Sequence, residues 1–217
     1  MSATRPSTRG TFVVIKHANQ KRIDLSKLTK RTLGTGNLRE AVRLPKNEKL
    51  EEWLATNCVD FYNEVSALYE LCLDDAERFS EPGEGFPANF EYRWADEKSR
   101  KPKLIRCSSP QYVNYVLNWI VEQVYNEEVF PTEENAKFPK DFLDIAHKML
   151  TRIFRVYAII YHAHFKVIEA QKAASHLNTS FKHFVFFVYE HGIMEDKEYK
   201  ALEEPVDRLV KQYNNTP

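Results

Sequence analysis

The chain has 217 residues, of which 43% are hydrophobic and 13% aromatic, and its formal net charge is +0. This length and composition fit one domain with a sizeable core and are short for two. No apolar run approaches the roughly 18 residues needed to span a bilayer. The first ten residues, MSATRPSTRG, also lack the apolar centre of a secretory signal. We therefore expect neither membrane insertion nor secretion.

The cysteines favour a reducing compartment. Cys58, Cys72 and Cys107 form neither an even disulfide set nor a Cys-x-x-Cys pair. The expected location is therefore cytoplasmic or nuclear.

The zero net charge hides an asymmetry along the chain. Residues 1–47 carry 11 Lys and Arg against 2 Asp and Glu, whereas residues 48–87 carry 2 against 11. The acidic segment should attract a basic peptide, and the basic segment an anion or an acidic surface. The same pattern also fits two solvated segments, or a basic arm that folds back onto the acidic face of its own chain.

Residues 1–30 are predicted to form a flexible basic arm, because their one short apolar run lies among basic and polar residues. Residues 28–47 are predicted to connect this arm to the rest of the chain, since Gly34 and Gly36 interrupt any helix. The remainder, residues 31–217, is expected to form one helical domain.

A long amphipathic helix is predicted next. Asn47 is expected as its N-cap, and Glu48, Glu51 and Glu52 suit the positive end of the helix dipole. Apolar residues then recur three and four positions apart, as on the buried face of a helix. They are Leu50, Trp53, Leu54, Cys58, Phe61, Tyr62, Val65, Leu68, Tyr69 and Cys72.

A loop and a hairpin are predicted to follow this helix. The loop RFSEPGEGFPANF leads to two β-prone segments, FEYRW and KLIRC, which are separated by charged residues. Ser109, as an N-cap before Pro110, then marks the start of another helix.

Three more helices are expected in the C-terminal third of the chain. They cover Phe142–Ile168, residues 176–192 up to Gly192, and residues 196–213 with a restart at Pro205. Long helices with apolar stripes and a single hairpin predict an all-α fold built as a helical bundle.

Four of the seven histidines lie between residues 162 and 183. His162 and His164 are two positions apart, roughly 200° around a helix axis, so they cannot hold one ion together. A zinc site needs three or four converging donors, and a catalytic histidine needs an orienting partner. No known catalytic or phosphate-loop motif is present. Core or surface histidines are therefore favoured over a metal or catalytic site.

Two further clusters leave alternatives open. Lys148, Thr151, Arg152 and Arg155 share one helical face, where adjacent arginines could grip a phosphate or form an ordinary solvated surface.

An acidic stripe runs along the first long helix, with Glu48, Glu52, Thr56 and Asp60 beside Trp53. An exposed tryptophan among carboxylates would anchor a basic amphipathic helix, although tryptophan at helical spacing more often belongs to the core.

Several long sequence strings, in order and at the right spacing, resemble the Mob family of kinase co-activators, closest to its Mob-one branch. The resemblance covers roughly residues 30 to 212. The strings are TLGTGNLREAVRLP, EWLATNCVDFYNEV, FEYRWAD, FPKDF, RIFRVYAIIYHAHF and HLNTSFKHFVFFV.

This resemblance implies a single-domain protein with a four-helix-bundle core, additional helices and no catalytic activity. It implies binding to the basic N-terminal regulatory segment of an NDR/LATS-type Ser/Thr kinase, in mitotic exit, cytokinesis or Hippo-like signalling. It also favours a monomer and adds cell-division structures to the expected locations. The family's kinase-binding positions correspond to Glu48, Glu52, Trp53, Thr56 and Asp60.

The resemblance also implies a pocket for phosphothreonine peptides of upstream Ste20-like kinases. Arg152 and Arg155 match two of its three basic positions, and the third is Thr151 here, so that one charge is lost. Arg100 and Lys101 match two further basic positions nearby.

Family members are phosphorylated at threonines that match Thr11 and Thr32, which releases the N-terminal arm from the kinase-binding face. This implied arrangement fits a basic arm beside an acidic helix.

The family's structural zinc is expected to be lost, and no other cofactor is expected. Its two cysteine positions correspond to Ala76 and Glu81, and its first histidine position to Ile159, so that only His164 remains. The loop around Phe79 and Phe86 is the expected replacement for the metal. Loose metal binding through Glu81 and His164 is the alternative.

Other functions lead to different expectations. A Mob-like scaffold with non-NDR clients would keep the fold but bind NDR/LATS-type segments weakly. A metalloenzyme using His162 or His164 would contain stoichiometric metal. A nucleic-acid binder using the basic arm would lose affinity steeply with salt. The kinase co-activator is the favoured function.

Overall fold

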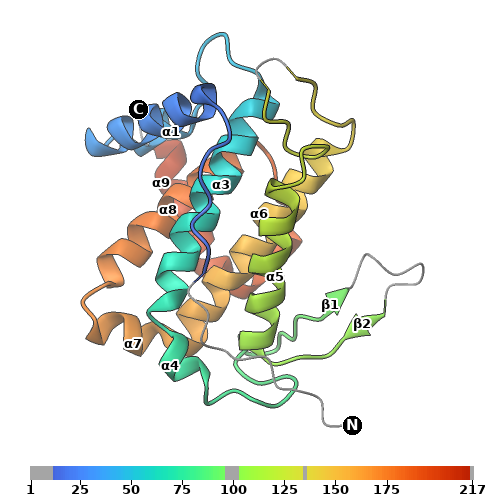
Figure 1. Cartoon of the computed structure of the whole chain (residues 1–217). Helices are drawn as coiled ribbons and strands as arrows, with labels where there is room; N and C mark the ends of the chain where they lie inside the picture. The colour runs from blue at the N-terminus through green and yellow to red at the C-terminus, as the bar shows by residue number, and fades with distance from the viewer. Residues whose placement is uncertain (1–11, 96–102, 134–135, 216–217) are drawn as a thin grey trace.

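The computed structural model describes residues 12–95, 103–133 and 136–215, which are largely helical (Figure 1). The all-α class expected from the sequence is confirmed. None of the helices in these ranges is long and apolar enough to cross a bilayer. The elements are α1 (Gln20–Gly34), α2 (Leu38–Val42), α3 (Leu50–Glu70), α4 (Leu73–Ala76), β1 (Trp94–Ala95), β2 (Leu104–Ile105), α5 (Ser109–Val124), α6 (Phe142–Ile159), the π-helix η1 (Ile160–His164), α7 (Phe165–Ala170), α8 (Ala174–Glu190), the 3-10 helices η2 (Asp196–Glu198) and η3 (Lys200–Leu202), and α9 (Glu203–Asn215).

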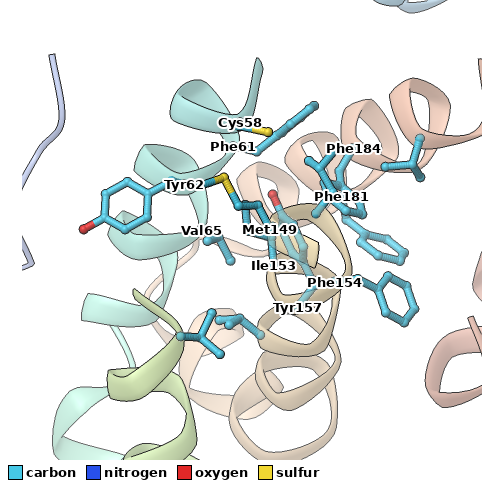
Figure 2. Close-up of a cluster of buried hydrophobic side chains, with 14 of the residues drawn as sticks. Cys58, Phe61, Tyr62, Val65, Met149, Ile153, Phe154, Tyr157, Phe181 and Phe184 are labelled. Atoms are coloured by element: carbon cyan, nitrogen blue, oxygen red, sulfur yellow. The ribbon is translucent and has the colours of Figure 1, made fainter. Parts of the chain in front are cut away.

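The core forms around α3, which packs against α1, α5, α6 and α8. Figure 2 shows side chains of α3, α6 and α8 meeting in one apolar cluster. Phe61, Ile153 and Phe184 are completely buried there, and each removes a large apolar surface from water. The predicted apolar stripe of α3 is therefore a core face, and Glu52 and Asp60 of the same helix contact α1.

The segment predicted as a flexible arm is packed on α3 from residue 12 onward (Figure 1). Residues 20–30 belong to the helix α1, so the boundary placed at residue 30 falls inside a helix. Asn19 is the N-cap of α1, and its side chain accepts a hydrogen bond from the Arg22 N–H at 3.0 Å. The sequence pattern missed α1 because its main anchors are polar and their partners lie about thirty residues away.

Two predicted helix starts shift slightly. Asn47 adopts a left-handed conformation with φ 67°, and Lys49 is the N-cap of α3, without a side-chain hydrogen bond. Ser108, rather than Ser109, is the N-cap of α5 and forms a capping box with Gln111. Asparagine tolerates the left-handed region, so Asn47 turns the chain two residues before the N-cap of α3.

The predicted hairpin is present but short. β1 and β2 pair antiparallel, with Trp94 opposite Ile105 and Ala95 opposite Leu104. The strands project away from the bundle (Figure 1). Trp94 stacks on Tyr115 of α5 with ring centroids 5.6 Å apart, which ties the base of the hairpin to the bundle.

The predicted helix Phe142–Ile168 is interrupted. α6 ends at Ile159, the π-helix η1 follows, and α7 resumes at Phe165. A π turn contains an extra residue and therefore changes which face the next side chains occupy. His164 is fully buried at the end of η1, while His162 is exposed and lies 3.0 Å from the Ala201 carbonyl oxygen.

Candidate functional site

The acidic α3 stripe, defined as Glu48, Glu52, Trp53, Thr56 and Asp60, is largely covered. Glu48 is half-buried and the other four residues are buried. Asp60 retains 8% exposure and Thr56 none. The sequence predicted these residues as a binding surface. Glu52, Trp53, Thr56 and Asp60 lie in α3, and Glu48 lies just before its N-cap Lys49. α1 and the chain that precedes it run beside α3 (Figure 1).

Ionic contacts hold α1 on this stripe. Arg22 Nε donates to Glu52 Oε2 at 2.8 Å, and the two side chains are 3% and 6% exposed. Lys21 pairs with Glu48 at 2.7 Å in a more exposed position. A buried ion pair must supply good geometry to offset the loss of hydration, so the Arg22–Glu52 contact makes this docking specific.

Asp60 is the second fixed point of the stripe. Its Oδ1 accepts a hydrogen bond from the Ser26 hydroxyl at 3.0 Å and lies 3.0 Å from Nε2 of His17. Ser26 belongs to α1, and His17 to the residues before it. One carboxylate therefore joins both parts of the N-terminal region to α3.

Residues 12–17, here called the N-terminal segment, contact α3 mainly through their backbone. The Phe12 N–H donates to Glu70 at 2.8 Å. Asn63 makes a paired contact with Ile15, accepting from its N–H and donating to its carbonyl, each at 2.9 Å. The Ile15 side chain is only 2% exposed. This face of α3 therefore holds an extended peptide by its backbone and one aliphatic anchor.

Trp53 is not the exposed anchor that the binding hypothesis required. It is 1% exposed, and its indole N–H lies 3.2 Å from the Val42 carbonyl oxygen. Its ring also packs against Phe187, with centroids 6.2 Å apart. The end of α2 and helix α8 cover this face of α3, so Trp53 supports the stripe from beneath.

The two predicted pocket arginines lie in an aromatic environment. The Arg152 guanidinium is 4.4 Å from the centroid of Trp94 and 4.0 Å from that of Trp119. Arg155 donates a hydrogen bond to the Tyr112 hydroxyl at 3.1 Å. We call Arg152 and Arg155 the basic pair. Aromatic contacts hold both guanidinium groups in place before any ligand arrives.

Thr151 faces a carboxylate instead of extending the basic pair. Its hydroxyl donates to Glu198 Oε1 at 3.1 Å. His147 Nε2 lies 3.1 Å from the other oxygen of the same carboxylate. Arg100 and Lys101 lie outside the described residues.

Of the two predicted phosphorylation positions, Thr32 lies within the described residues. Thr32 is half-buried in α1, and its hydroxyl donates to the Leu28 carbonyl oxygen at 3.0 Å. Thr11 lies outside the described residues, directly before Phe12.

The residues at the family's zinc positions do not suit a metal site. Ala76 and Ile159 are buried apolar side chains, and Glu81 is exposed. His164 Nδ1 donates to Asp75 Oδ2 at 2.7 Å, while its Nε2 is buried near the rings of Tyr69 and Phe79. Within the described ranges, His, Cys, Asp and Glu side chains form no group of three that could hold an ion.

A polar cross-link joins the loop after α3 to the π-helix. Arg78 pairs with Asp75 at 3.1 Å and donates to the Ala163 carbonyl oxygen at 2.7 Å. We call Asp75, Arg78 and His164 the loop clasp. Phe79 packs edge-on against His164, as the replacement hypothesis expected, whereas Phe86 contacts Tyr92 and Tyr112 elsewhere.

His183 of α8 lies beneath the stripe. Its ring packs against Phe61 with centroids 4.8 Å apart, and both ring nitrogens lack hydrogen-bond partners among the described residues. Burial lowers the pKa of His183 to about 4, although the Asp60 charge opposes this shift.

We expect His183 to make the protein less stable in mild acid. Between pH 6.5 and 4 the unfolded chain binds this proton and the folded chain does not, so the free energy of unfolding falls as pH falls. The loss should be about 1 kcal/mol between pH 7.5 and 5.5. Urea denaturation of wild type and His183→Phe at both pH values tests this.

His176→Asn, an exposed position on the same helix, is the matched control and should leave the pH dependence unchanged. A pH dependence that is identical in wild type and His183→Phe would contradict the assignment.

Sequence reasoning missed the partners of the site. Asn63, Glu70 and Glu198 are ordinary polar residues in the sequence, and only their contacts give them roles. For Asn63 and Glu70 the one local signal was their helical spacing from stripe residues in α3, which also fits a solvated face, and Glu198 in η2 gave no such signal.

Comparison with known proteins identifies the family of this chain. A family model described as the Mob1/phocein family matches residues 30–202. The chain is 42% identical over 204 residues to maintenance of ploidy protein mob1 from Schizosaccharomyces pombe, covering 94% of this chain and 97% of that protein. It is 44% identical over 200 residues to MOB kinase activator-like 1A from Arabidopsis thaliana, covering 90% and 91%. The family match begins inside α1 and includes both the α3 stripe and the basic pair.

Proposed function

Because the chain belongs to the Mob1/phocein family, its role is that of a kinase co-activator rather than an enzyme, and we propose that its kinase is of the NDR/LATS type. The basic N-terminal regulatory segment of that kinase binds the acidic α3 stripe. The stripe supports this proposal because it holds three carboxylates, one on Glu48 just before α3 and two on Glu52 and Asp60 within it. The resulting activation serves mitotic exit, cytokinesis or Hippo-like signalling.

The single observation that carries the proposal is that the chain's own basic region already occupies the stripe. Arg22, Lys21 and His17 contact Glu52, Glu48 and Asp60, respectively. A cationic partner with the same chemistry would have to displace them. The apparent affinity of the kinase segment is then its intrinsic affinity multiplied by the fraction of molecules in which the stripe is open.

Phosphorylation at Thr11 and Thr32 opens the stripe in this proposal. Phe12, which follows Thr11 in the sequence, donates its N–H to the Glu70 carboxylate, so this contact with α3 begins one residue after Thr11. A phosphate at Thr32 would add bulk and charge at a half-buried side chain of α1.

Removing residues 1–18 is expected to increase affinity for a basic NDR-type kinase segment by about tenfold or more. This deletion removes the His17 contact and the N-terminal segment but keeps Asn19, the N-cap of α1. Calorimetric titration of the full and shortened chains with the same kinase segment measures the change.

Two controls define the result. His176→Asn in the shortened chain, a substitution at an exposed position of α8, should leave affinity unchanged. Asp60→Asn in the shortened chain should weaken binding roughly tenfold. If a folded shortened chain binds no NDR-type segment, the kinase assignment fails and a scaffold with other clients takes its place.

The basic pair provides a second binding site in the proposed function. Arg152 and Arg155 supply planar donors that suit a phosphate, and their aromatic contacts hold them in place. The ligand is a phosphothreonine peptide from an upstream Ste20-like kinase. The protein acts without a metal cofactor, as a monomer, in the cytoplasm, nucleus or cell-division structures.

A further inference from the structure

Glu198 is fixed beside the basic pair by contacts from two directions. Thr151 and His147, one helical turn apart on α6, contact its two carboxylate oxygens at 3.1 Å each. From behind, the Glu195 N–H donates to Oε2 at 2.9 Å within the capping box of η2. Its side chain is 15% exposed, so the carboxylate is anchored but reaches solvent.

This carboxylate is charged in the folded protein. Burial disfavours its charge, but hydrogen bonds from the Glu195 N–H, His147 and Thr151 prevail and lower the pKa of Glu198. The carboxylate of Glu198 is hydrogen-bonded to Thr151, which lies one helical turn before Arg155 on α6.

The charge of Glu198 acts on Arg155. Burial alone would lower the pKa of Arg155, yet Tyr112, Tyr92 and Glu198 together raise it. Burial also raises the pKa values of both tyrosines, so Glu198 is the charged member of this set at neutral pH.

We propose that Glu198 is a built-in competitor of phosphate, a residue that sets how strongly the basic pair binds a phosphothreonine peptide. The inference rests on the proposed phosphopeptide function. With Thr151 supplying a hydroxyl where a third cation would stand, Glu198 offsets one of the two guanidinium charges. The phosphate group then contributes less to the binding free energy, and the rest of the peptide must add contacts of its own.

The test uses the full chain and a degenerate peptide mixture with a fixed central phosphothreonine, together with the same mixture unphosphorylated. Glu198→Gln should bind the phosphorylated mixture about three- to tenfold more tightly than wild type does. Binding of the unphosphorylated mixture should not change. Glu203→Gln removes the same charge at an exposed neighbouring position and should leave both affinities unchanged.

Two further readouts separate an electrostatic role from a structural one. The gain in Glu198→Gln should shrink at about 1 M salt, where charges are screened within a few ångströms. Thr151→Lys should also tighten phosphopeptide binding, because it adds a cation without removing the η2 capping contacts. A loosened fold would reproduce neither effect, and thermal unfolding of each variant checks that the fold is intact.

The outcomes separate this inference from the function on which it rests. If neither wild type, Glu198→Gln nor Thr151→Lys prefers the phosphorylated mixture, phosphopeptide binding itself is wrong. If wild type shows the preference but Glu198→Gln binds no more tightly, or if the gain persists at high salt, Glu198 is not a competing charge.

Discussion

Replacing Glu52 with alanine is expected to destabilise the protein by about 3 to 5 kcal/mol, because the change leaves the buried Arg22 guanidinium without its carboxylate. Arg22 is 2% exposed and lies over the Phe138 ring, so it has little room to reach water without moving α1. We expect α1 to detach first. Urea denaturation measures the total loss, and amide hydrogen exchange identifies α1 as the segment that opens.

The neighbouring ion pair, between Lys21 of α1 and Glu48 just before α3, is a matched control. Lys21→Met removes the ion pair with Glu48, whose two side chains are 34% and 24% exposed, and should change stability by no more than about 1 kcal/mol. A double variant, Arg22→Met with Glu52→Met, should recover most of the loss, since replacing both buried charges can be neutral. Equal effects of Glu52→Ala and Lys21→Met would contradict this account of how α1 is held.

The Glu52 variant also has a functional consequence. If α1 and the N-terminal segment compete with the kinase segment, loosening α1 exposes Asp60 while removing one acidic contact. Arg22→Met therefore provides the cleaner binding experiment, because it loosens α1 and leaves the stripe intact. Its affinity for the basic kinase segment should rise.

His164→Ala is expected to destabilise the protein by about 2 to 4 kcal/mol. The fully buried imidazole fills space between Tyr69 and Phe79, and its Nδ1–H satisfies the Asp75 carboxylate. The substitution leaves both a cavity and a carboxylate with one fewer partner. Thermal and urea denaturation measure the loss.

Unfolding measurements with a chelator, together with the zinc content of wild type, test whether the loop clasp replaces a metal. A chelator should not change the unfolding transition of wild type, and total zinc should be well below one per chain. His176→Ala, on the exposed side of α8, is the control and should have little effect on stability. Stoichiometric zinc whose removal lowers stability would overturn the metal-free proposal.

The helical core could be predicted from the sequence because its signal is local and periodic. Apolar residues at three- and four-residue spacing marked the core face of α3, and all of them except the half-buried Leu50 are buried. The hairpin register and the π turn could not be derived in this way. Trp94 opposite Ile105 depends on a pairing across eleven positions, and η1 depends on packing around His164.

The candidate site was predictable in its residues but not in its accessibility. Asp60 and Glu52 were identified as acidic stripe positions, yet their burial depends on Ser26 and Arg22, distant in sequence. Likewise, Arg152 and Arg155 were identified from spacing, whereas Glu198 joins them through a short 3-10 helix more than forty residues later. Polar contacts over such distances leave no periodic pattern.

The sequence by itself determined the fold class, the acidic stripe and the basic pair. Each of these is a property of residue type at a local spacing. Only the tertiary structure decided that α1 covers the stripe, that a carboxylate stands beside the basic pair, and that Asp75 binds His164. Those outcomes are set by which side chains meet when distant helices pack, and the cost of burying a charge makes each partner specific.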